Sequence, residues 1–215
     1  MSARAVLFDL DGTLVDLRAA YIKAHKRAAF EVLSIELDER RILELMSSGS
    51  PIRMHMARLD ESAADRLVAV FVERYREERD GLARPFPGIR RLLASLCDQS
   101  VRLAVVTSKL REDAIAELAA ARLQEFVEVV VTFEDVDEHK PAPAPQRAAL
   151  QRLGVSSGIG VGDLPSDVLS ARAAGLRALA VGWGYGSPAG LSAAGAERVC
   201  ETVEELDEAL CDLLG

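Results

Sequence analysis

The sequence predicts an α/β protein: a Rossmann-like parallel sheet with helices on both faces, plus an inserted α-helical cap domain. The first observation is a set of short, continuous apolar runs, which are typical of strands buried on both faces. The second is that stretches rich in Ala and Leu, with helical spacing, separate these runs, as in sheets built from crossover units. The expected strands span residues 5–8, 101–106, 127–131, 159–161 and 176–181.

The third observation is a long interval that breaks this alternation and contains no convincing strand. Amphipathic helices are expected there over residues 18–33, 38–46 and 62–79. The run Pro85-Phe86-Pro87-Gly88 then punctuates the return to the sheet. The sequence therefore predicts a core domain of residues 1–15 and 85–215 and a helical cap domain of residues 16–84, with hinges where the two meet.

Composition narrows the classes of function. A net charge of −8 argues against a broad surface for nucleic acid or anionic lipid, since both require clustered Lys and Arg. Three widely spaced cysteines provide neither a disulfide framework nor a zinc site. No apolar run approaches the roughly 20 residues that cross a bilayer. We expect a cytoplasmic protein, a monomer or homodimer, that binds neither nucleic acid nor membrane.

Two carboxylates, Asp9 and Asp11, follow the first expected strand in the run Asp9-Leu10-Asp11-Gly12-Thr13. Open parallel sheets bind their ligands at the carboxyl ends of the strands. Neighbouring carboxylates repel each other, so a divalent cation is a natural partner. The structural alternative is an ordinary strand followed by an Asp-Gly turn.

Polar residues also follow the next two expected strands. Thr107 and Ser108 offer hydroxyl groups that could hold phosphate oxygens, although Ser108 could instead cap a helix that begins near Arg111. Lys140 lies on a loop stiffened by proline. A lysine is usually a solvated surface charge, and only its position after a strand favours a functional role.

A second pair of carboxylates, Asp163 and Asp167, follows the fourth expected strand. Asp163 at the strand end and Asp167 in the first helical turn would face the same edge of the sheet. Helix capping by Asp163, with Pro165 early in the helix, is a compatible structural alternative.

Carboxylates, hydroxyl, lysine and carboxylates thus occur in order, each at the end of a strand. In this respect the chain resembles the haloacid dehalogenase superfamily of phosphohydrolases, over its whole length. The four motifs of that superfamily match residues 9–13, Thr107, Lys140, and Asp163 with Asp167. Pro87-Gly88 and the run of residues 182–186 further resemble the phosphoglycolate phosphatase-like subgroup.

The resemblance implies a mechanism. Asp9 would attack phosphorus and form an aspartyl-phosphate, while Asp11 would protonate the leaving oxygen and then activate water. Mg²⁺ would be held by Asp9, Asp163 and the main-chain carbonyl of Asp11, with Asp167 acting through water. The residues expected to bind the phosphoryl group are Leu10 and Gly12 through backbone amides, Thr107, Ser108 and Lys140.

The substrate implied is a small phosphorylated metabolite, and its recognition is expected from the cap. Gly49 and Arg53 are the candidate specificity residues, although a Ser-Gly-Ser-Pro stretch is more often a plain turn between helices. Asp11 disfavours a dehalogenase or a phosphonoacetaldehyde hydrolase, because relatives with those activities replace this aspartate. Sugar phosphomutase and pyrophosphatase activities stay open, and so does a non-catalytic phosphate-binding module.

Overall fold

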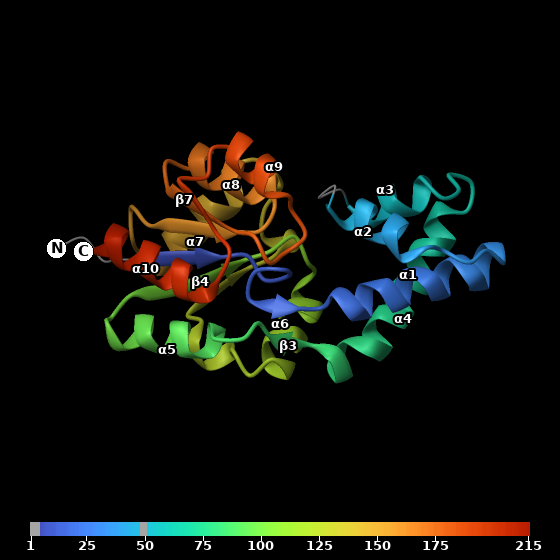
Figure 1. Ribbon diagram of the computed structural model, residues 1–215, viewed down its shortest axis with the longest axis horizontal. Coiled ribbons are helices and arrows are strands. Elements are labelled where there is room, and N and C mark those ends of the chain that lie inside the picture. Colours follow the sequence, from blue (N-terminus) through green and yellow to red (C-terminus); the bar gives the residue numbers. More distant parts are fainter. Residues whose placement is uncertain (1–4, 48–50) are drawn as a thin grey trace. The chain divides into compact units, whose positions relative to one another are not determined.

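A computed structural model describes residues 5–47 and 51–215, and its centre is a six-stranded sheet in which every neighbouring pair is parallel (Figure 1). The strand order is β5-β4-β1-β6-β7-β8. This is the doubly wound arrangement, in which the order reverses at the first strand, and ligands bind beyond the carboxyl ends at that reversal. The strands are β1 (Ala5–Phe8), β4 (Arg102–Val106), β5 (Val129–Val131), β6 (Ile159–Gly162), β7 (Arg177–Val181) and β8 (Arg198–Cys200).

Helices cover both faces of the sheet, as predicted (Figure 1). On one face, α7 (Ala144–Leu153), α8 (Pro165–Ala173) and α9 (Pro188–Ala193) supply apolar side chains that pack with Ala5 and Leu7 of β1. On the other face lie α5 (Ile89–Asp98) and α10 (Val203–Leu214), which contact each other. The α/β fold class is therefore confirmed. The remaining helical segments of this unit are α6 (Arg111–Ala120) and the 3₁₀ turns Gln124–Phe126 and Phe133–Asp135.

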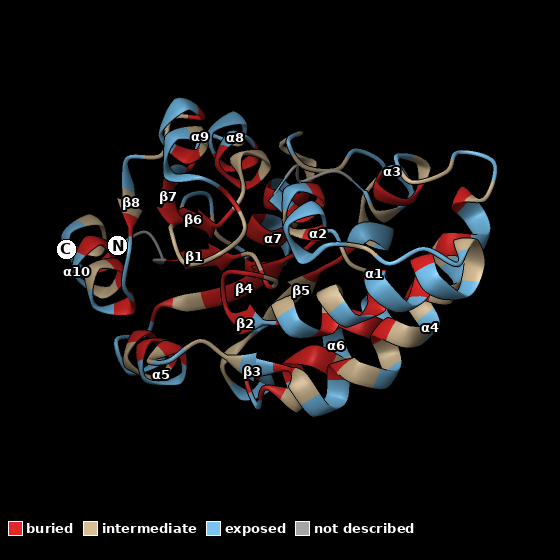
Figure 2. Cartoon of the chain, turned by 45° about the vertical axis from the view of Figure 1, so that its right-hand side comes forward, coloured by how far each residue is buried: buried red, intermediate tan, exposed pale blue. Residues whose placement is uncertain are grey.

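Burial on both faces explains why the strands could be recognised. Every residue of β1 is buried, and Figure 2 shows the central strands as buried elements beneath helices that expose their outer sides. Three strands, β4, β5 and β7, begin later than expected. Before β4 and β7, the apolar residue that was expected to start the strand closes the preceding helix instead. The Val101 amide donates to the Leu96 carbonyl at 3.0 Å, and the Leu176 amide donates to the Ala171 carbonyl at 3.0 Å.

The chain divides into two compact units. The core unit comprises the residues up to Asp16 together with Arg84–Gly215, and the helical unit comprises Leu17–Ala83. The two connections between the units pair as short antiparallel strands within the core unit, with Val15 opposite Pro85. These strands are β2 (Val15–Asp16) and β3 (Arg84–Pro85).

The helical unit is built from α1 (Arg18–Leu33), α2 (Glu39–Ser47), α3 (Ile52–Ala57) and α4 (Ala64–Leu82). Its interior contains rings from α1 and α4. The ring centroids of Tyr21 and Tyr75 are 4.9 Å apart, and those of His25 and Phe71 are 4.8 Å apart. Across the described part of the chain, no helix combines the length and apolar character needed to span a membrane.

Candidate active site

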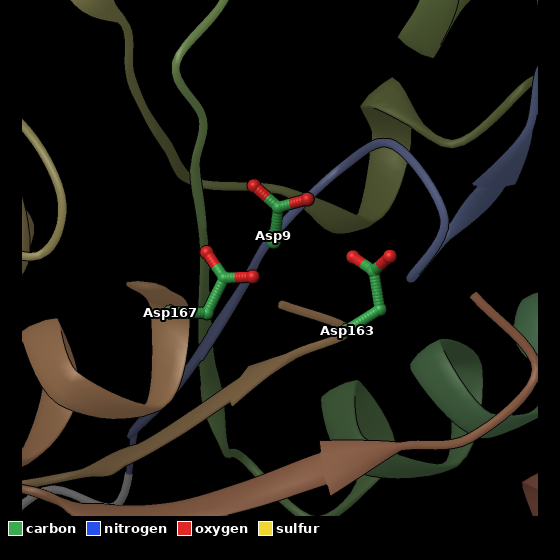
Figure 3. Close-up of side chains that lie close together, drawn as sticks. All are labelled: Asp9, Asp163 and Asp167. Carbon is green, nitrogen blue, oxygen red and sulfur yellow. The ribbon is translucent and has the colours of Figure 1, made fainter. Parts of the chain in front are cut away.

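Three carboxylates converge at the carboxyl edge of the sheet (Figure 3). Asp9 directly follows β1, Asp163 directly follows β6, and Asp167 is the third residue of α8. One ligand oxygen from each lies within 4.8 Å of the others. The side chains of Asp9 and Asp167 are only 11% and 6% exposed, and Asp163 is fully buried. The fold thus brings together acidic residues separated by up to 158 positions because β1 and β6 are neighbours in the sheet.

Lys140 is the cation of this cluster. Its Nζ donates to Asp9 Oδ1 at 2.7 Å and to Asp167 Oδ1 at 2.6 Å. A third bond, at 2.6 Å, reaches the carbonyl of Val106 at the end of β4. Burial opposes the charged ammonium, but the two carboxylates outweigh this effect and raise the pKa of Lys140. The lysine is therefore a fixed cation, with its side chain 4% exposed.

The carboxylates carry more negative charge than this lysine balances. Burial raises the pKa of Asp9 to about 7, although Lys140 acts in the opposite direction. Burial also raises the pKa of Asp163 well above its usual value, and the charges of Asp9 and Asp167 add to that effect. With every carboxylate ionised, the cluster carries two unbalanced negative charges. A divalent cation would balance them, and carboxylate oxygens are the ligands that Mg²⁺ prefers.

Asp163 is held in a fixed orientation from two sides. The Thr13 hydroxyl donates to Oδ1 at 3.1 Å, and the Tyr185 amide donates to Oδ2 at 2.8 Å. Space for this carboxylate depends on two glycines: a Cβ at Gly12 or at Gly184 would lie 2.4 Å from Oδ2. Sequence reasoning missed the roles of Thr13 and the Tyr185 amide. The signal that could have identified them was the glycine-rich run of residues 182–186, because it follows β7 and therefore lies at the same edge of the sheet.

Asp11 has separate partners. Its carboxylate is not one of the three in the acidic cluster, and its Oδ2 lies 3.2 Å from Nζ of Lys109. The same Nζ lies 2.7 Å from Oε1 of Glu117, which is fully buried on α6. Sequence reasoning did not single out Lys109 or Glu117. The signal for Lys109 was a cation two residues after Thr107, at the end of β4.

The structure also places the expected phosphate-binding residues. Thr107 is buried at the end of β4, where its hydroxyl accepts a 3.3 Å bond from the Lys109 amide, and Ser108 is exposed. Leu10 is buried beside Asp9. The Gly12 amide donates to the Val15 carbonyl at 3.0 Å, because the chain turns there with a positive φ of 78°. The Gly12 amide is therefore engaged within the turn. Asp163 occupies the space that a side chain at position 12 would need.

Two alternatives based on helix capping are wrong as stated. Leu110, not Ser108, precedes α6. The Arg111 amide at the start of the helix donates to Oε2 of Glu134 at 2.5 Å. At α8, the residue that accepts from the Leu164 amide is Asp167, at 3.0 Å, and not Asp163. Asp167 therefore combines a capping bond through Oδ2 with the Lys140 contact through Oδ1.

The expected specificity residues belong to the helical unit. Gly49 lies outside the described residues. Arg53, on α3, has a side chain that is 54% exposed, and its guanidinium bonds Asp65 at 2.8 Å and Glu61 at 3.4 Å. The structure thus gives Arg53 surface ion pairs within its own unit.

Comparison with known proteins agrees with this fold. Residues 6–181 match the model of the haloacid dehalogenase-like hydrolase family. A phosphoglycolate phosphatase of Cupriavidus necator, carried on a plasmid, is 35% identical over 209 residues, which is 94% of this chain and 90% of that protein. The pyrophosphatase PpaX of Oceanobacillus iheyensis is 32% identical over 185 residues, or 85% of each chain.

A solved structure supports the same assignment. A haloacid dehalogenase-like family hydrolase from Streptococcus pneumoniae is 27% identical, with a TM-score of 0.86 over 98% of both chains. The chain belongs to the haloacid dehalogenase-like hydrolase family. The predicted family resemblance and the prediction of a hydrolytic enzyme are confirmed.

Proposed function

We propose that this protein is a Mg²⁺-dependent phosphatase that hydrolyses a small phosphomonoester, similar to phosphoglycolate, through an aspartyl-phosphate on Asp9. The observation that carries the proposal is the convergence of Asp9, Asp163 and Asp167 around Lys140 at the sheet edge where ligands bind. Buried carboxylates that repel one another reduce stability, so their accumulation at one sheet edge favours a role in chemistry.

The donor set fits Mg²⁺. We assign the ion to the carboxylates of Asp9 and Asp163 and to the main-chain carbonyl of Asp11, with Asp167 acting through a water molecule. When bound, Mg²⁺ would offset the repulsion between an anionic nucleophile and an anionic phosphate. Thr13 and the Tyr185 amide support this role, because they fix Asp163 in orientation.

In the first chemical step, a carboxylate oxygen of Asp9 attacks phosphorus, and the bond from phosphorus to the ester oxygen breaks. Asp11 donates a proton to that departing oxygen. In the second step Asp11 takes a proton from water, the water oxygen attacks phosphorus, and the bond to Asp9 breaks to release inorganic phosphate. Lys140 supports the first step, because its 2.7 Å bond to Oδ1 holds the nucleophile in place.

We assign the transferring phosphoryl oxygens to Lys140, the Thr107 and Ser108 hydroxyls, and the backbone at Leu10. The Gly12 amide, which donates to the Val15 carbonyl, supports the turn that carries this backbone. Charge in the transition state is spread over the phosphoryl oxygens, so fixed donors and a fixed cation stabilise it more than they stabilise the substrate. Lys140 has the strongest support, because it is buried and held by three bonds.

A small phosphomonoester is the preferred substrate because a relative 35% identical over nearly the whole chain is named a phosphoglycolate phosphatase. Pyrophosphate is the second candidate, favoured by the similarity to the pyrophosphatase of Oceanobacillus iheyensis. We assign substrate choice to the helical unit, with Gly49 and Arg53 as candidate residues, and place the enzyme in the cytoplasm as a monomer or homodimer. A sugar phosphomutase is disfavoured because those enzymes carry a histidine where this chain has Tyr21.

The test is release of inorganic phosphate by the purified protein, with and without Mg²⁺, from p-nitrophenyl phosphate, phosphoglycolate, sugar phosphates, nucleotides and pyrophosphate. We expect turnover that requires Mg²⁺ and is most efficient, by kcat/KM, on a small monoester. Asp9→Asn should lower kcat by at least about 10³-fold, because an amide oxygen is a poor nucleophile. Circular dichroism should show that the variant is folded.

Three results would redirect the proposal. Phosphate migration within a hexose phosphate, without release, would indicate a mutase. Near-normal turnover by the Asp9→Asn variant would remove Asp9 from the nucleophilic role. A folded wild-type protein that binds phosphate but hydrolyses none of the esters would favour the non-catalytic module.

A further inference from the structure

Two different lysines contact the two aspartates of the first motif. Lys140 contacts Asp9 and Asp167, whereas Lys109 contacts Asp11. Lys109 follows β4, and its side chain is 11% exposed, so this second cation is largely enclosed by the core unit. An enclosed lysine holds its partner in a narrower range of positions than a surface lysine does.

Lys109 is itself held by a buried carboxylate. Glu117 is fully buried on the inner side of α6, and its Oε1 lies 2.7 Å from Nζ of Lys109. Burial of such an ion pair seldom adds stability over apolar side chains of similar size. A leucine or methionine at position 117 would pack at least as favourably. The presence of a carboxylate there therefore points to a requirement other than stability.

We propose that Glu117 and Lys109 form a positioning relay that orients the Asp11 carboxylate for proton transfer to the leaving oxygen, an inference that rests on the proposed phosphatase function. Helix α6 anchors Glu117, Glu117 fixes Lys109, and Lys109 fixes Oδ2 of Asp11. General acid catalysis demands this kind of control, because the proton must lie within hydrogen-bond reach of the departing oxygen. Lys109 and Glu117 are thus positioning residues that act through Asp11.

The relay has a kinetic signature that a purely structural role lacks. A basic alkoxide leaves only with a proton from the general acid, whereas p-nitrophenolate leaves readily without one. Loss of control over the position of Asp11 should therefore slow phosphoryl transfer from alkyl phosphates far more than transfer from p-nitrophenyl phosphate. Loss of the nucleophile, the metal or the fold would slow both classes together.

The experiment compares kcat/KM of Lys109→Met and wild type on p-nitrophenyl phosphate and on a simple alkyl phosphate. This ratio reports the first chemical step, in which the leaving group departs, whereas kcat also contains the second step, which both esters share. We expect kcat/KM for the alkyl ester to fall at least ~10-fold more than kcat/KM for the aryl ester. Glu117→Gln should show the same pattern with a smaller amplitude. Equal losses of kcat/KM on both esters would overturn the relay.

Two further variants address misfolding of Lys109→Met and test whether Lys109 acts through Asp11. If Lys109→Met alone fails to fold, the double variant Lys109→Met/Glu117→Met removes both buried charges and should fold. It should still lose more activity on the alkyl ester than on the aryl ester. In an Asp11→Asn background, Lys109→Met should lower kcat/KM by less than about 3-fold further, because residues that act as one unit are not additive. Independent, multiplicative losses would contradict the proposal.

Arg177→Met is the matched control. Arg177 begins β7 at the opposite edge of the sheet and pairs with Glu197, with its side chain 51% exposed. This variant also exchanges an ion-paired cation for methionine, and kcat/KM on both esters should stay within about 2-fold of wild type. Wild-type protein that hydrolyses no ester would overturn the phosphatase function and the relay together. Active wild type with uniform losses in Lys109→Met would overturn the relay alone.

Discussion

The core unit and the helical unit differ in how far they enclose their lysines. In the core unit, the lysines that follow β4 and β5 are enclosed: the side chains of Lys109 and Lys140 are 11% and 4% exposed. In the helical unit, Lys23 is 53% exposed where it pairs with Glu78, and Arg27 is 45% exposed where it pairs with Glu77. The lysine ion pairs are therefore exposed in the helical unit and enclosed in the core unit.

The interiors differ accordingly. The helical unit buries rings, including Phe71, Tyr75 and the imidazole of His25, whose Nδ1 donates to the Tyr21 carbonyl at 2.8 Å. The core unit instead concentrates carboxylates at a single sheet edge. Buried charge lowers stability unless it is balanced, so the concentration of carboxylates at one edge supports the proposed active site there.

The largest expected effect contrasts two lysines. Lys140→Met leaves Asp9 and Asp167 buried without their counter-charge and should reduce the free energy of unfolding by about 3–5 kcal/mol in Mg²⁺-free buffer. Lys23→Met removes an exposed ion pair and should reduce it by less than about 1 kcal/mol. Urea unfolding of both variants measures the difference. Similar decreases in the free energy of unfolding would mean that burial does not determine how much these ion pairs contribute to stability.

Mg²⁺ should stabilise the core unit to an extent that depends on pH. The raised pKa values of Asp9 and Asp163 mean that, without metal, the folded protein binds more protons than the unfolded chain above the ordinary carboxyl pKa. Stability of the metal-free protein should therefore fall as pH rises toward and through about 7. Mg²⁺ at 100 times its Kd should restore about 2.7 kcal/mol. A fixed concentration of Mg²⁺ should stabilise the protein more at higher pH, because deprotonated carboxylates bind the ion more tightly.

The measurement is the shift of Tm with Mg²⁺ across that range of pH. Asp163→Asn is the control, because it removes one carboxylate of the cluster and should reduce the Mg²⁺-induced shift. A shift that grows as the pH falls would contradict the assignment of the ion to these carboxylates.

The helical unit should respond to pH in the opposite sense. Burial lowers the pKa of His25, an effect that its bond to the Tyr21 carbonyl only partly offsets. The unfolded chain then takes up a proton more readily, so the contribution of neutral His25 is complete above the ordinary pKa and is lost as the pH falls. Opening of α1 should become easier by up to about 1.4 kcal/mol per pH unit below that point.

Hydrogen exchange over Arg18–Leu33, corrected for the intrinsic effect of pH, measures that opening. His25→Phe keeps a ring beside Phe71 and removes the titration, so its α1 should open with a weaker dependence on pH. An unchanged slope in that variant would assign the effect to another group.

The smallest effect is expected at Arg53. Its exposed pairs with Asp65 and Glu61 should contribute less than about 1 kcal/mol, so Arg53→Ala should stay folded. If Arg53 contacts substrate, the variant should change the ratio of kcat/KM values between substrates more than activity toward p-nitrophenyl phosphate. Arg40→Ala, at a side chain that is 86% exposed, is the control. An equal fall on every substrate would remove Arg53 from substrate selection.

Much of the fold was readable from local pattern. The expected helix over residues 18–33 coincides with α1, and the strand over residues 5–8 coincides with β1. Continuous burial gives a strand an unbroken apolar run, and one-sided burial gives a helix its spacing. By contrast, β8 was not predicted, because it has only three residues and its first, Arg198, is exposed.

The sequence by itself determined which residue types stand at the strand ends, because the alternation of strands and helices marks those positions wherever the strands later pair. Only the tertiary structure decided their partners. The Thr13 hydroxyl reaches Asp163 across 150 positions, and Glu117 on α6 meets a lysine from the loop before it. Periodicity reports which side of an element a residue faces, whereas the partner it meets there depends on sheet order and on the packing of neighbouring helices.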